Sequence, residues 1–480
     1  MRLPPRLPLI RRTKIVATIG PASLSRPVLR ELFAAGLNVA RVTMAHGTRD
    51  SQKALIAAIR EEADAGGDSV AILVDLPGPK VRTTPFVGTV ELALNDVVTM
   101  IPGAQQPSTA STFVVDYPSL TDDLQVGDVV GIGDGIVHLL VEERTDAALK
   151  ARVVHAGQLT GRKGVKIPTE RLRANVPTDE DLEMIEALKD SPVDIIAVSF
   201  VRSAADMLAV RKVVPAGGPW LMAKIETALA IENLTEIIKA SDAVMVARGD
   251  LGTELPIEDV PHLQKQIIKE TVRNGKPVLV ATQMLESMIE SPTPTRAEAT
   301  DVANAVFDQA SAVMLSAETA IGHDPVLVIK TMDRMLRRAE LELDPGRLQA
   351  FALEGRDLSD VNVATAHAAW QAASDLTASA ILCCTRTGAT ARKMSSFRPL
   401  TPIYAMSGDA RARRQLSLCW GVQPLVLTHT QTSTEEVMQA AIDAAKHAGV
   451  ISAGNIVVVL AGSPQAGPGH TDSVRVATVS

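Results

Sequence analysis

The sequence has few cysteines, no long hydrophobic run and no excess of basic residues. Its three cysteines, Cys383, Cys384 and Cys419, are an odd number in a chain of 480 residues, which argues against a disulfide framework and for a reducing compartment. No run approaches the roughly 18 consecutive apolar residues of a membrane-spanning helix. With 48 basic and 55 acidic side chains the net charge is −7, which gives no electrostatic case for binding nucleic acid.

The N-terminal segment "MRLPPRLPLIRRTK" is basic, but three prolines interrupt its apolar stretch and no small-residue cleavage site follows. We therefore expect a cytoplasmic protein whose partners include neither a membrane nor a nucleic acid. The length predicts about three domains, enough for an enzyme with accessory domains.

Eight short apolar runs, rich in Val, Ile and Leu, alternate with longer helical patterns. This alternation is typical of a parallel sheet built from βα units. The runs occupy residues 14–18, 37–41, 70–75, 194–200, 220–226, 243–250, 277–283 and 312–318. They predict an α/β fold with a (β/α)₈ TIM barrel, in which chemistry takes place at the C-terminal ends of the strands.

Polar residues stand at the C-terminal ends of all eight predicted strands. They are Thr18, Arg41, Asp75, Ser199, Lys224, Glu226, Arg248, Asp250, Thr282, Ser316 and Glu318. A single polar strand end is commonly a loop start or a helix cap. Eight together, with acids and bases among them, indicate a functional site at one end of the barrel.

Two further domains interrupt and follow the barrel. Residues 84–175 alternate apolar and polar residues between Gly-Asp and Asn-Asp turns, which predicts an inserted all-β domain. After the eighth run, a long helix and a polar connection lead to four more strand-like runs. We expect a barrel of residues 1–83 and 176–348, the insertion at 84–175, and a C-terminal α/β open-sheet domain at 349–480.

Glu226 and Asp250 end consecutive predicted strands, so the barrel would bring their carboxylates close together. Oxygen ligands without a neighbouring Cys or His suit Mg²⁺ or Mn²⁺ rather than zinc. Lys224 points the same way from its strand as Glu226, and a lysine with two acids and a metal suits an anionic, phosphorylated or enolic substrate. A Lys224–Glu226 pair by itself is also a common structural salt bridge. If Gly249 and Asp250 open a short helix, their N–H groups could hold a carboxylate.

Seven segments resemble the successive motifs of the pyruvate kinase family, in order from residue 13 to the C-terminus. They are "TKIVATIGPAS", "GLNVARVTMAHG", "AKIETALAIENLTEII", "SDAVMVARGDLGTELP", "GKPVLVATQMLESMI", "PTRAEATDVANAVFDQASAVMLSAETA" and "GNIVVVLAGSP". The resemblance covers the whole chain. It implies phosphoryl transfer from phosphoenolpyruvate to ADP, giving pyruvate and ATP in the last step of glycolysis. It also implies a β-barrel lid as the insertion, a regulatory or oligomerisation role for the C-terminal domain, and a homotetramer.

The resemblance assigns roles to residues at the barrel mouth. Lys224 would stabilise the charge of the phosphoryl group in transfer, while Glu226 and Asp250 would hold Mg²⁺ (or Mn²⁺). The carboxylate of the substrate would bind to Gly249, Asp250 and Thr282.

Other implied roles concern the proton and the phosphates. Thr282 and Ser316 would take part in protonating the enolate, and Arg41 would contact phosphate. The residues implied on the nucleotide side are Arg82, Lys163, His46 and Asp134. A turn aspartate explains Asp134 equally well, and a loop histidine bonded to the backbone is an alternative for His46.

The loop "TRTGAT" of the third domain follows a predicted strand and precedes a helix. Its hydroxyl and amide groups could cradle a phosphate, and in the family this loop binds a sugar-phosphate effector in regulated members. A helix N-cap explains the loop equally well. The residues concerned are Thr385, Arg386, Thr387, Gly388 and Thr390.

The chain departs from the family pattern where most members bind K⁺. The usual Asn, Ser, Asp and Thr ligands correspond here to Thr43, Ala45, Asp75 and Leu76, so that only Asp75 is unchanged. Lys80, in "GPKVR", replaces a family Glu and would supply the positive charge that K⁺ supplies elsewhere. We predict activity without K⁺; the alternative for Lys80 is a surface lysine after a turn.

Two other functions are compatible with parts of this pattern. A catalytically silent relative that senses a sugar phosphate or nucleotide is suggested by Thr43 and Ala45. A Mg²⁺-dependent enolate lyase is suggested by the paired acids, but it would not need an inserted lid with nucleotide contacts.

Overall fold

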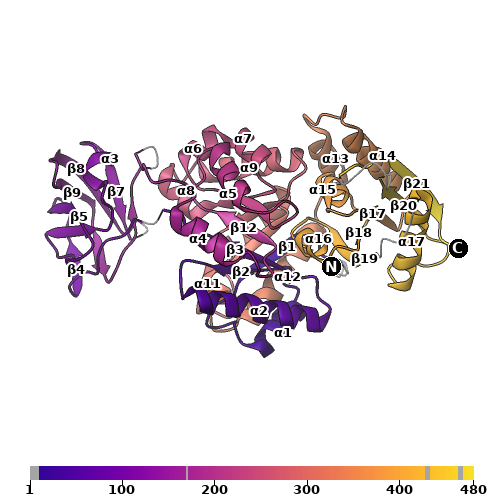
Figure 1. The fold of residues 1–480 in the computed structure, drawn as a ribbon, viewed down its shortest axis with the longest axis horizontal. Helices are drawn as coiled ribbons and strands as arrows, with labels where there is room; N and C mark the ends of the chain where they lie inside the picture. Colours follow the sequence, from indigo (N-terminus) through magenta and orange to yellow (C-terminus); the bar gives the residue numbers. More distant parts are fainter. Residues whose placement is uncertain (1–9, 80, 134, 169–170, 428–432, 463–468) are drawn as a thin grey trace.

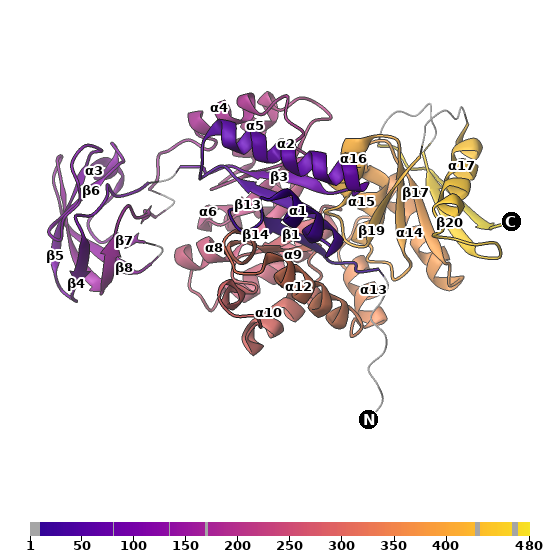
Figure 2. The same cartoon turned by 90° about the horizontal axis from the view of Figure 1, so that it is seen from below.

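The computed structural model describes residues 10–79, 81–133, 135–168, 171–427, 433–462 and 469–480. Figures 1 and 2 show an elongated molecule with a barrel in the middle, an all-β part at one end and a C-terminal α/β part at the other. In the described ranges no helix is both long and apolar enough to cross a membrane.

The central barrel is closed by eight parallel strands in the order β1-β16-β15-β14-β13-β12-β3-β2. This confirms the predicted TIM barrel, because each apolar run forms one strand and these strands are almost entirely buried. The strands are β1 (Lys14–Thr18), β2 (Val39–Thr43), β3 (Ala71–Asp75), β12 (Ile195–Val198), β13 (Trp220–Ile225), β14 (Ala243–Ala247), β15 (Val278–Ala281) and β16 (Ala312–Leu315).

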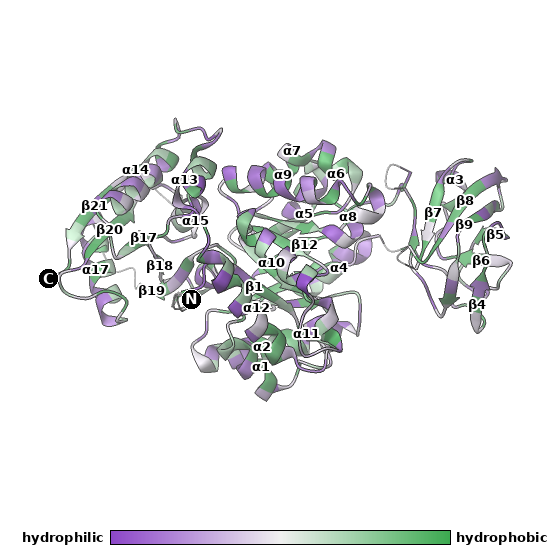
Figure 3. Cartoon of the chain, turned by 180° about the vertical axis from the view of Figure 1, so that it is seen from behind, coloured by the Kyte–Doolittle hydropathy of each residue, from purple (hydrophilic) through white to green (hydrophobic). Residues whose placement is uncertain are grey.

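Amphipathic helices surround the barrel. Hydrophobic and hydrophilic segments alternate along them, as expected for helices with one buried face (Figure 3). A capping box of Thr48 and Ser51 begins α2, and Gly67 ends it in the left-handed conformation with φ 73°. The helices are α1 (Arg26–Ala34), α2 (Arg49–Gly66), α4 (Asp179–Ala187), α5 (Ala204–Val213), α6 (Ala228–Glu232), α7 (Leu234–Ala240), α8 (Arg248–Glu254), α9 (Val260–Arg273), η1 (Glu286–Ile289), α10 (Arg296–Phe307), α11 (Ala317–Ala320) and α12 (Pro325–Glu340).

The inserted part is built of β-strands and one four-residue helix, α3, and in the described residues its strands form two separate sheets. They form a six-stranded sheet, β11-β7-β8-β9-β5-β6, and a two-stranded sheet, β10-β4. β10 pairs with β4 in the smaller sheet. Near it, Thr83 with Val115 and Phe86 with Ser108 form single bridges that do not extend into a ladder. The elements are β4 (Thr89–Leu92), β5 (Val97–Pro102), β6 (Thr112–Val115), α3 (Leu120–Asp123), β7 (Val129–Ile132), β8 (Val137–Arg144), β9 (Leu149–His155), β10 (Gly157–Thr160) and β11 (Val165–Lys166).

The C-terminal part contains a five-stranded sheet in the order β19-β18-β17-β20-β21. Its first four strands are the predicted ones, whereas β21 is an additional strand antiparallel to β20. The polar connection after α12 contains helix α13, which starts at Asp344 and Pro345, a good cap and first residue. The elements are α13 (Pro345–Leu353), α14 (Val361–Asp375), β17 (Ala380–Cys384), α15 (Ala389–Ser396), β18 (Ile403–Ser407), α16 (Ala410–Leu416), β19 (Val422–Val426), α17 (Thr434–His447), β20 (Ile456–Ala461) and β21 (Ser473–Thr478).

The C-terminal part packs against the N-terminal ends of the barrel strands. One buried cluster joins barrel residues such as Val16 and Leu73 to C-terminal residues such as Phe397 and Leu416. The opposite end of the barrel, where the strands end, therefore remains available for a site. The three cysteines are buried and free, in agreement with the absence of a disulfide framework.

Candidate active site at the barrel mouth

Lys224 lies at the centre of the polar groups at the barrel mouth. Its Nζ donates to Ser199 Oγ at 2.7 Å, and lies 3.2 Å from Glu226 Oε2 and 3.5 Å from Asp75 Oδ1. Ser199 Oγ in turn donates to the carbonyl of Leu76 at 2.7 Å, so the end of β12 fixes the position of the ammonium.

The electrostatic surroundings keep Lys224 charged. Burial opposes the ammonium form, but the carboxylates of Asp75, Glu226 and Asp250 outweigh burial and raise the pKa of Lys224. A largely buried ammonium that stays charged and is held in a fixed position can stabilise negative charge on a substrate.

Glu226 has one carboxylate oxygen available for a ligand. Oε1 accepts a hydrogen bond from the N–H of Phe200 at 2.7 Å, whereas the buried Oε2 has no hydrogen-bond partner among the described residues and lies 3.2 Å from Lys224 Nζ. Burial, opposed by Lys224 and reinforced by Asp250, raises the pKa of Glu226. A buried oxygen with no hydrogen bond is the arrangement that a bound hard cation would complete.

Asp250, in the helix that follows β14, lies close enough to Glu226 for its charge to act on that carboxyl group, and β14 pairs with β13. The predicted short helix is present as α8, with Gly249 and Asp250 in its first turn. Among the described residues no group of three or more His, Cys, Asp or Glu could hold a metal. Two carboxylates with further oxygens from substrate and water are nevertheless a usual Mg²⁺ site, so the residues present fit that ion.

Thr282 and Ser316 follow the next two strands, β15 and β16, as predicted. Thr282 Oγ1 accepts from the N–H of Gly249 at 2.8 Å and donates to the carbonyl of Ala281 at 2.6 Å. The N–H of Ser316 donates to Glu318 at 2.6 Å, and the same carboxylate accepts from the N–H of Leu285 at 3.1 Å. Buried Glu318 therefore joins the two loops that carry these hydroxyls.

Arg41 is held at the mouth by Asp75 and Thr18. Its Nε and Nη2 lie 2.8 and 2.7 Å from Asp75 Oδ2, and its Nη1 donates to Thr18 Oγ1 at 2.8 Å. Burial disfavours the Asp75 carboxylate, but Lys224 and Arg41 outweigh that effect and lower its pKa. The expected cation position at Thr43 faces Asp75 in the β2–β3 register, and Lys80 lies outside the described residues.

Two of the residues predicted for the nucleotide side, Arg82 and Lys163, lie on paired segments of the chain. Arg82 pairs with Gly164 in an isolated bridge at the base of the all-β part, and the N–H of Thr83 donates to the carbonyl of Lys163 at 2.8 Å. Arg82 and Lys163 are thus close in the fold. His46 is exposed after β2, and its carbonyl accepts from Gln52, while Asp134 lies outside the described residues.

The loop predicted to hold a phosphate lies in the C-terminal part. Thr385 Oγ1 accepts from the N–H of Gly388 at 2.9 Å, and Gly388 adopts the left-handed conformation with φ 85°. Thr390 shares a hydrogen bond of 2.7 Å with Thr471, while Arg386 and Thr387 are exposed.

Three residues contribute to the mouth in ways that the sequence did not reveal. The sequence marks Thr18 and Ser199 only as polar strand ends, whereas in the structure their hydroxyls accept from Arg41 and Lys224. Lys166, in β11, donates to the carbonyl of Asp250 at 2.8 Å and lies 3.8 Å from Glu254. No sequence signal predicts this contact, because it joins two domains.

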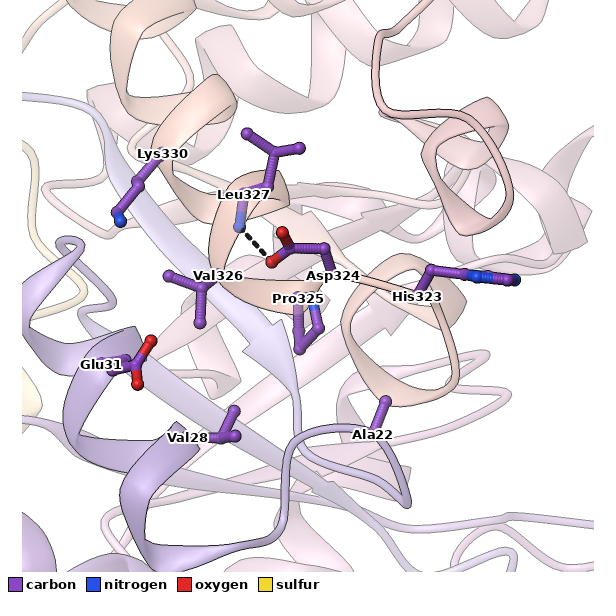
Figure 4. A pocket seen from close by; sticks show the side chains of 9 residues that line it. All are labelled: Ala22, Val28, Glu31, His323, Asp324, Pro325, Val326, Leu327 and Lys330. Atoms are coloured by element: carbon purple, nitrogen blue, oxygen red, sulfur yellow. Dashed lines mark hydrogen bonds between the residues drawn. The ribbon is translucent and has the colours of Figure 1, made fainter.

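A pocket of about 400 Å³ lies on the flank of the barrel, between α1 and α12 (Figure 4). Glu31 and Lys330 line it from opposite sides, and Asp324 caps α12 by accepting from the N–H of Leu327 at 2.9 Å. None of the residues that line it is a predicted site residue. The convergence of charged groups therefore identifies the barrel mouth, and not this pocket, as the candidate active site.

Comparison with known proteins gives one consistent result. The family described as "Pyruvate kinase, barrel domain" matches residues 10–329, and "Pyruvate kinase, alpha/beta domain" matches residues 363–477. The chain is 41% identical to pyruvate kinase 2 of Synechocystis sp. over 98% of its own length and 80% of that protein. It is 35% identical to a pyruvate kinase of Clostridium acetobutylicum over 98% of the chain and 100% of that protein. A crystal structure of a pyruvate kinase from Cryptosporidium parvum superposes with a TM-score of 0.91 at 32% identity, covering 98% of this chain and 96% of that one.

Proposed function

Since the chain belongs to the pyruvate kinase family and is an enzyme of that family, we propose that its barrel mouth transfers the phosphoryl group of phosphoenolpyruvate to ADP with Mg²⁺ and without a requirement for K⁺. The observation that carries this proposal is the largely buried, charged Lys224 surrounded by Asp75, Glu226 and Asp250.

Lys224 would neutralise the charge that spreads over the phosphoryl oxygens during transfer, because phosphoryl transfer depends mainly on positioning and charge stabilisation. Ser199 holds the ammonium in place before substrate arrives. Glu226 and Asp250 would hold Mg²⁺, which when bound would supply further positive charge at the phosphate and enolpyruvate oxygens. The unbonded Oε2 of Glu226 supports this role.

The first turn of α8, together with Thr282, would bind the carboxylate of the substrate. The N–H of Gly249, which donates to Thr282 Oγ1 in this structure, would turn to the incoming carboxylate with the N–H of Asp250. The freed hydroxyl of Thr282 would then act, with Ser316, where the enolate takes up its proton. Both hydroxyls follow adjacent strands, which supports a shared role.

The nucleotide side is proposed to consist of Arg82, Lys163, His46 and Asp134. The pairing of the Arg82 and Lys163 segments supports a common site at the base of the insertion. Lys166 joins that insertion to α8 by donating to the carbonyl of Asp250, so movement of the lid would change the position of Asp250. Closure would exclude water from a transfer that could otherwise end in hydrolysis.

Independence from K⁺ is supported by the surroundings of Asp75. Both of its oxygens face cationic side chains, Arg41 at Oδ2 and Lys224 at Oδ1, so the carboxylate is not free for a monovalent ion. Ala45 and Leu76 offer no side-chain oxygen at two of the usual ligand positions. Lys80 would provide the missing positive charge.

We extend the proposal to the rest of the chain. The domains would comprise residues 1–83 with 176–348, 84–175 and 349–480, and the last would serve regulation and assembly into a homotetramer. The Thr385–Thr390 loop would receive a sugar-phosphate or nucleotide effector. The glycolytic role that the resemblance implies would place the protein in the cytoplasm.

Formation of pyruvate from phosphoenolpyruvate tests the proposal, measured with and without ADP, Mg²⁺ and K⁺. We expect pyruvate only when ADP and Mg²⁺ are present, at a rate that K⁺ leaves unchanged, and none from Lys224→Met. Pyruvate without ADP would indicate a lyase, no pyruvate would indicate a silent sensor, and a rate that rises many-fold with K⁺ would overturn the K⁺ assignment.

A further inference from the structure

Thr282 and Gln283 adopt a backbone conformation that side chains rarely take. Their φ angles are 71° and 56°, both in the left-handed region. For a β-branched residue such as Thr this is an outlier, and such conformations persist only where surrounding contacts hold them. The strained turn follows β15 directly and presents the hydroxyl that the proposed function uses.

Arg248 supplies the contacts that hold this turn. Its Nη2 donates to the carbonyl of Thr282 at 2.6 Å, and its Nε donates to the carbonyl of Ala281 at 3.3 Å. Its Nη1 donates to Asp301 on α10 at 2.7 Å, an ion pair that orients the guanidinium. All three nitrogens of the guanidinium are therefore engaged, and the side chain is largely buried.

Thr282 is consequently held from two sides by one segment. Arg248 binds its carbonyl, and the N–H of the next residue, Gly249, binds its hydroxyl. The segment lies at the start of α8, directly after β14, which pairs with β15. A rigid planar fork can satisfy two consecutive carbonyls and a carboxylate together, which the single point charge of a lysine cannot.

We propose that Arg248 is a positioning residue that holds Thr282 in its left-handed conformation, and so sets the place of the hydroxyl at the mouth. This inference rests on the proposed function, in which Thr282 binds the substrate carboxylate and takes part in protonating the enolate. Arg248 itself does not bind substrate phosphate, because its donors face Asp301 and the β15 turn.

The test compares wild type, Arg248→Met, Arg248→Lys, Thr282→Ala and the double variant Arg248→Met/Thr282→Ala. We expect kcat to fall about 100-fold in both Arg248 variants, the loss typical of a catalytic group displaced by about 1 Å, while KM for ADP stays within about twofold. The double variant should be no slower than Thr282→Ala alone, because Arg248 acts through Thr282. Exchange of the methyl protons of pyruvate with D₂O, followed by NMR, should fall in parallel.

Arg211→Met serves as the matched control. Arg211 forms an ion pair with Asp242 at 2.6 Å at the opposite end of the barrel, so its loss removes a comparable interaction without touching the β15 turn. Its kcat should remain within about twofold of wild type.

Three results would overturn the inference: wild-type kcat in Arg248→Met, full restoration by Arg248→Lys, or a double variant whose losses multiply. If Arg248→Met does not fold, Asp301→Asn replaces it, since this change frees the guanidinium without removing it; unchanged kcat would then overturn the inference. The formation of pyruvate by the wild-type protein tests the proposed function independently of the Arg248 variants. In a crystal structure of Arg248→Met, a Thr282 φ that remains near 71° would overturn the inference even if wild type made no pyruvate.

Discussion

Arg41 donates to Asp75 through two of its nitrogens, and both contacts end on the same oxygen, Oδ2, at 2.8 and 2.7 Å. The other oxygen, Oδ1, faces Lys224 at 3.5 Å. The carboxylate that would be the surviving ligand of a K⁺ site is thus neutralised by two side chains of the protein. In the proposed function, the further positive charge at the mouth comes from Lys80 and from the Mg²⁺ held by Glu226 and Asp250.

We predict that Lys80→Glu lowers kcat by about tenfold or more, because a carboxylate would replace the proposed fixed positive charge close to the transferred phosphoryl. K⁺ should not restore the activity, since the side-chain oxygens at positions 45 and 76 are absent. Initial rates in Na⁺ and K⁺ buffers measure this. Lys80→Met, which removes charge without adding the opposite one, should give an intermediate rate; unaltered activity of Lys80→Glu would show that Lys80 is a surface lysine.

Glu226→Gln should raise the Mg²⁺ concentration needed for half-maximal rate by at least about tenfold. The amide keeps the shape of the side chain and removes its negative charge, including that on Oε2, which has no hydrogen-bond partner among the described residues. Loss of a residue that only supports a metal ligand already costs about 10–100-fold in affinity, and a direct ligand should cost at least as much. A Mg²⁺ titration of the rate checks this, with exposed Glu258→Gln as the control; identical titration curves for Glu226→Gln and wild type would remove Glu226 from the metal site.

Asp194→Asn should destabilise the protein by about 3–5 kcal/mol, the usual cost of leaving buried charges without their partner. The fully buried Asp194 carboxylate lies 2.9 Å from both Arg60 of the barrel and Arg414 of α16. Chemical denaturation followed by circular dichroism measures the change. Asp64→Asn is the matched control, because Asp64 also contacts Arg60 but is exposed; an equal effect of both variants would contradict the prediction.

The stability of the protein should rise with pH above neutrality because of Lys14. Burial lowers the pKa of Lys14 from 10.5 to about 7, and its Nζ donates to the carbonyl of Val422 at 2.7 Å. Between about pH 7 and 10.5 the unfolded chain binds a proton at this lysine that the folded chain does not. The free energy of unfolding therefore increases with pH across this window, by about 2 kcal/mol from pH 7 to pH 9.

Lys14→Met should lack this contribution. Unfolding curves of both proteins at pH 7 and pH 9 give the change in the free energy of unfolding with pH for each. Subtracting the change of the variant from that of wild type isolates the contribution of Lys14, because the other groups titrate alike in both proteins. Parallel behaviour of wild type and variant over the two pH values would show that Lys14 keeps its ordinary pKa in the folded state.

Much of the fold followed from local patterns. Apolar runs of five to eight residues, rich in Val, Ile and Leu, indicate buried strands. Eight such strands in alternation with amphipathic helices are the number that closes a (β/α)₈ barrel. Strand β21 carries no buried apolar run, because its residues alternate between half-buried and exposed, and it owes its pairing to β20. Helix α13 lies in the segment predicted as a polar connection; Asp344 and Pro345, a cap and a first helical residue, are the local signals of its start.

The sequence alone determined which groups could gather at the mouth, because strand ends of a parallel barrel meet at one end whatever the loops do. It therefore predicted that Lys224, Glu226, Asp250 and Thr282 lie together. Only the tertiary structure decided how these groups are held: Ser199 on Lys224, Lys166 on Asp250, and Arg248 on Thr282. These contacts join residues that are far apart in the chain or depend on the direction of a side chain, and neither property is encoded in a local pattern of residues.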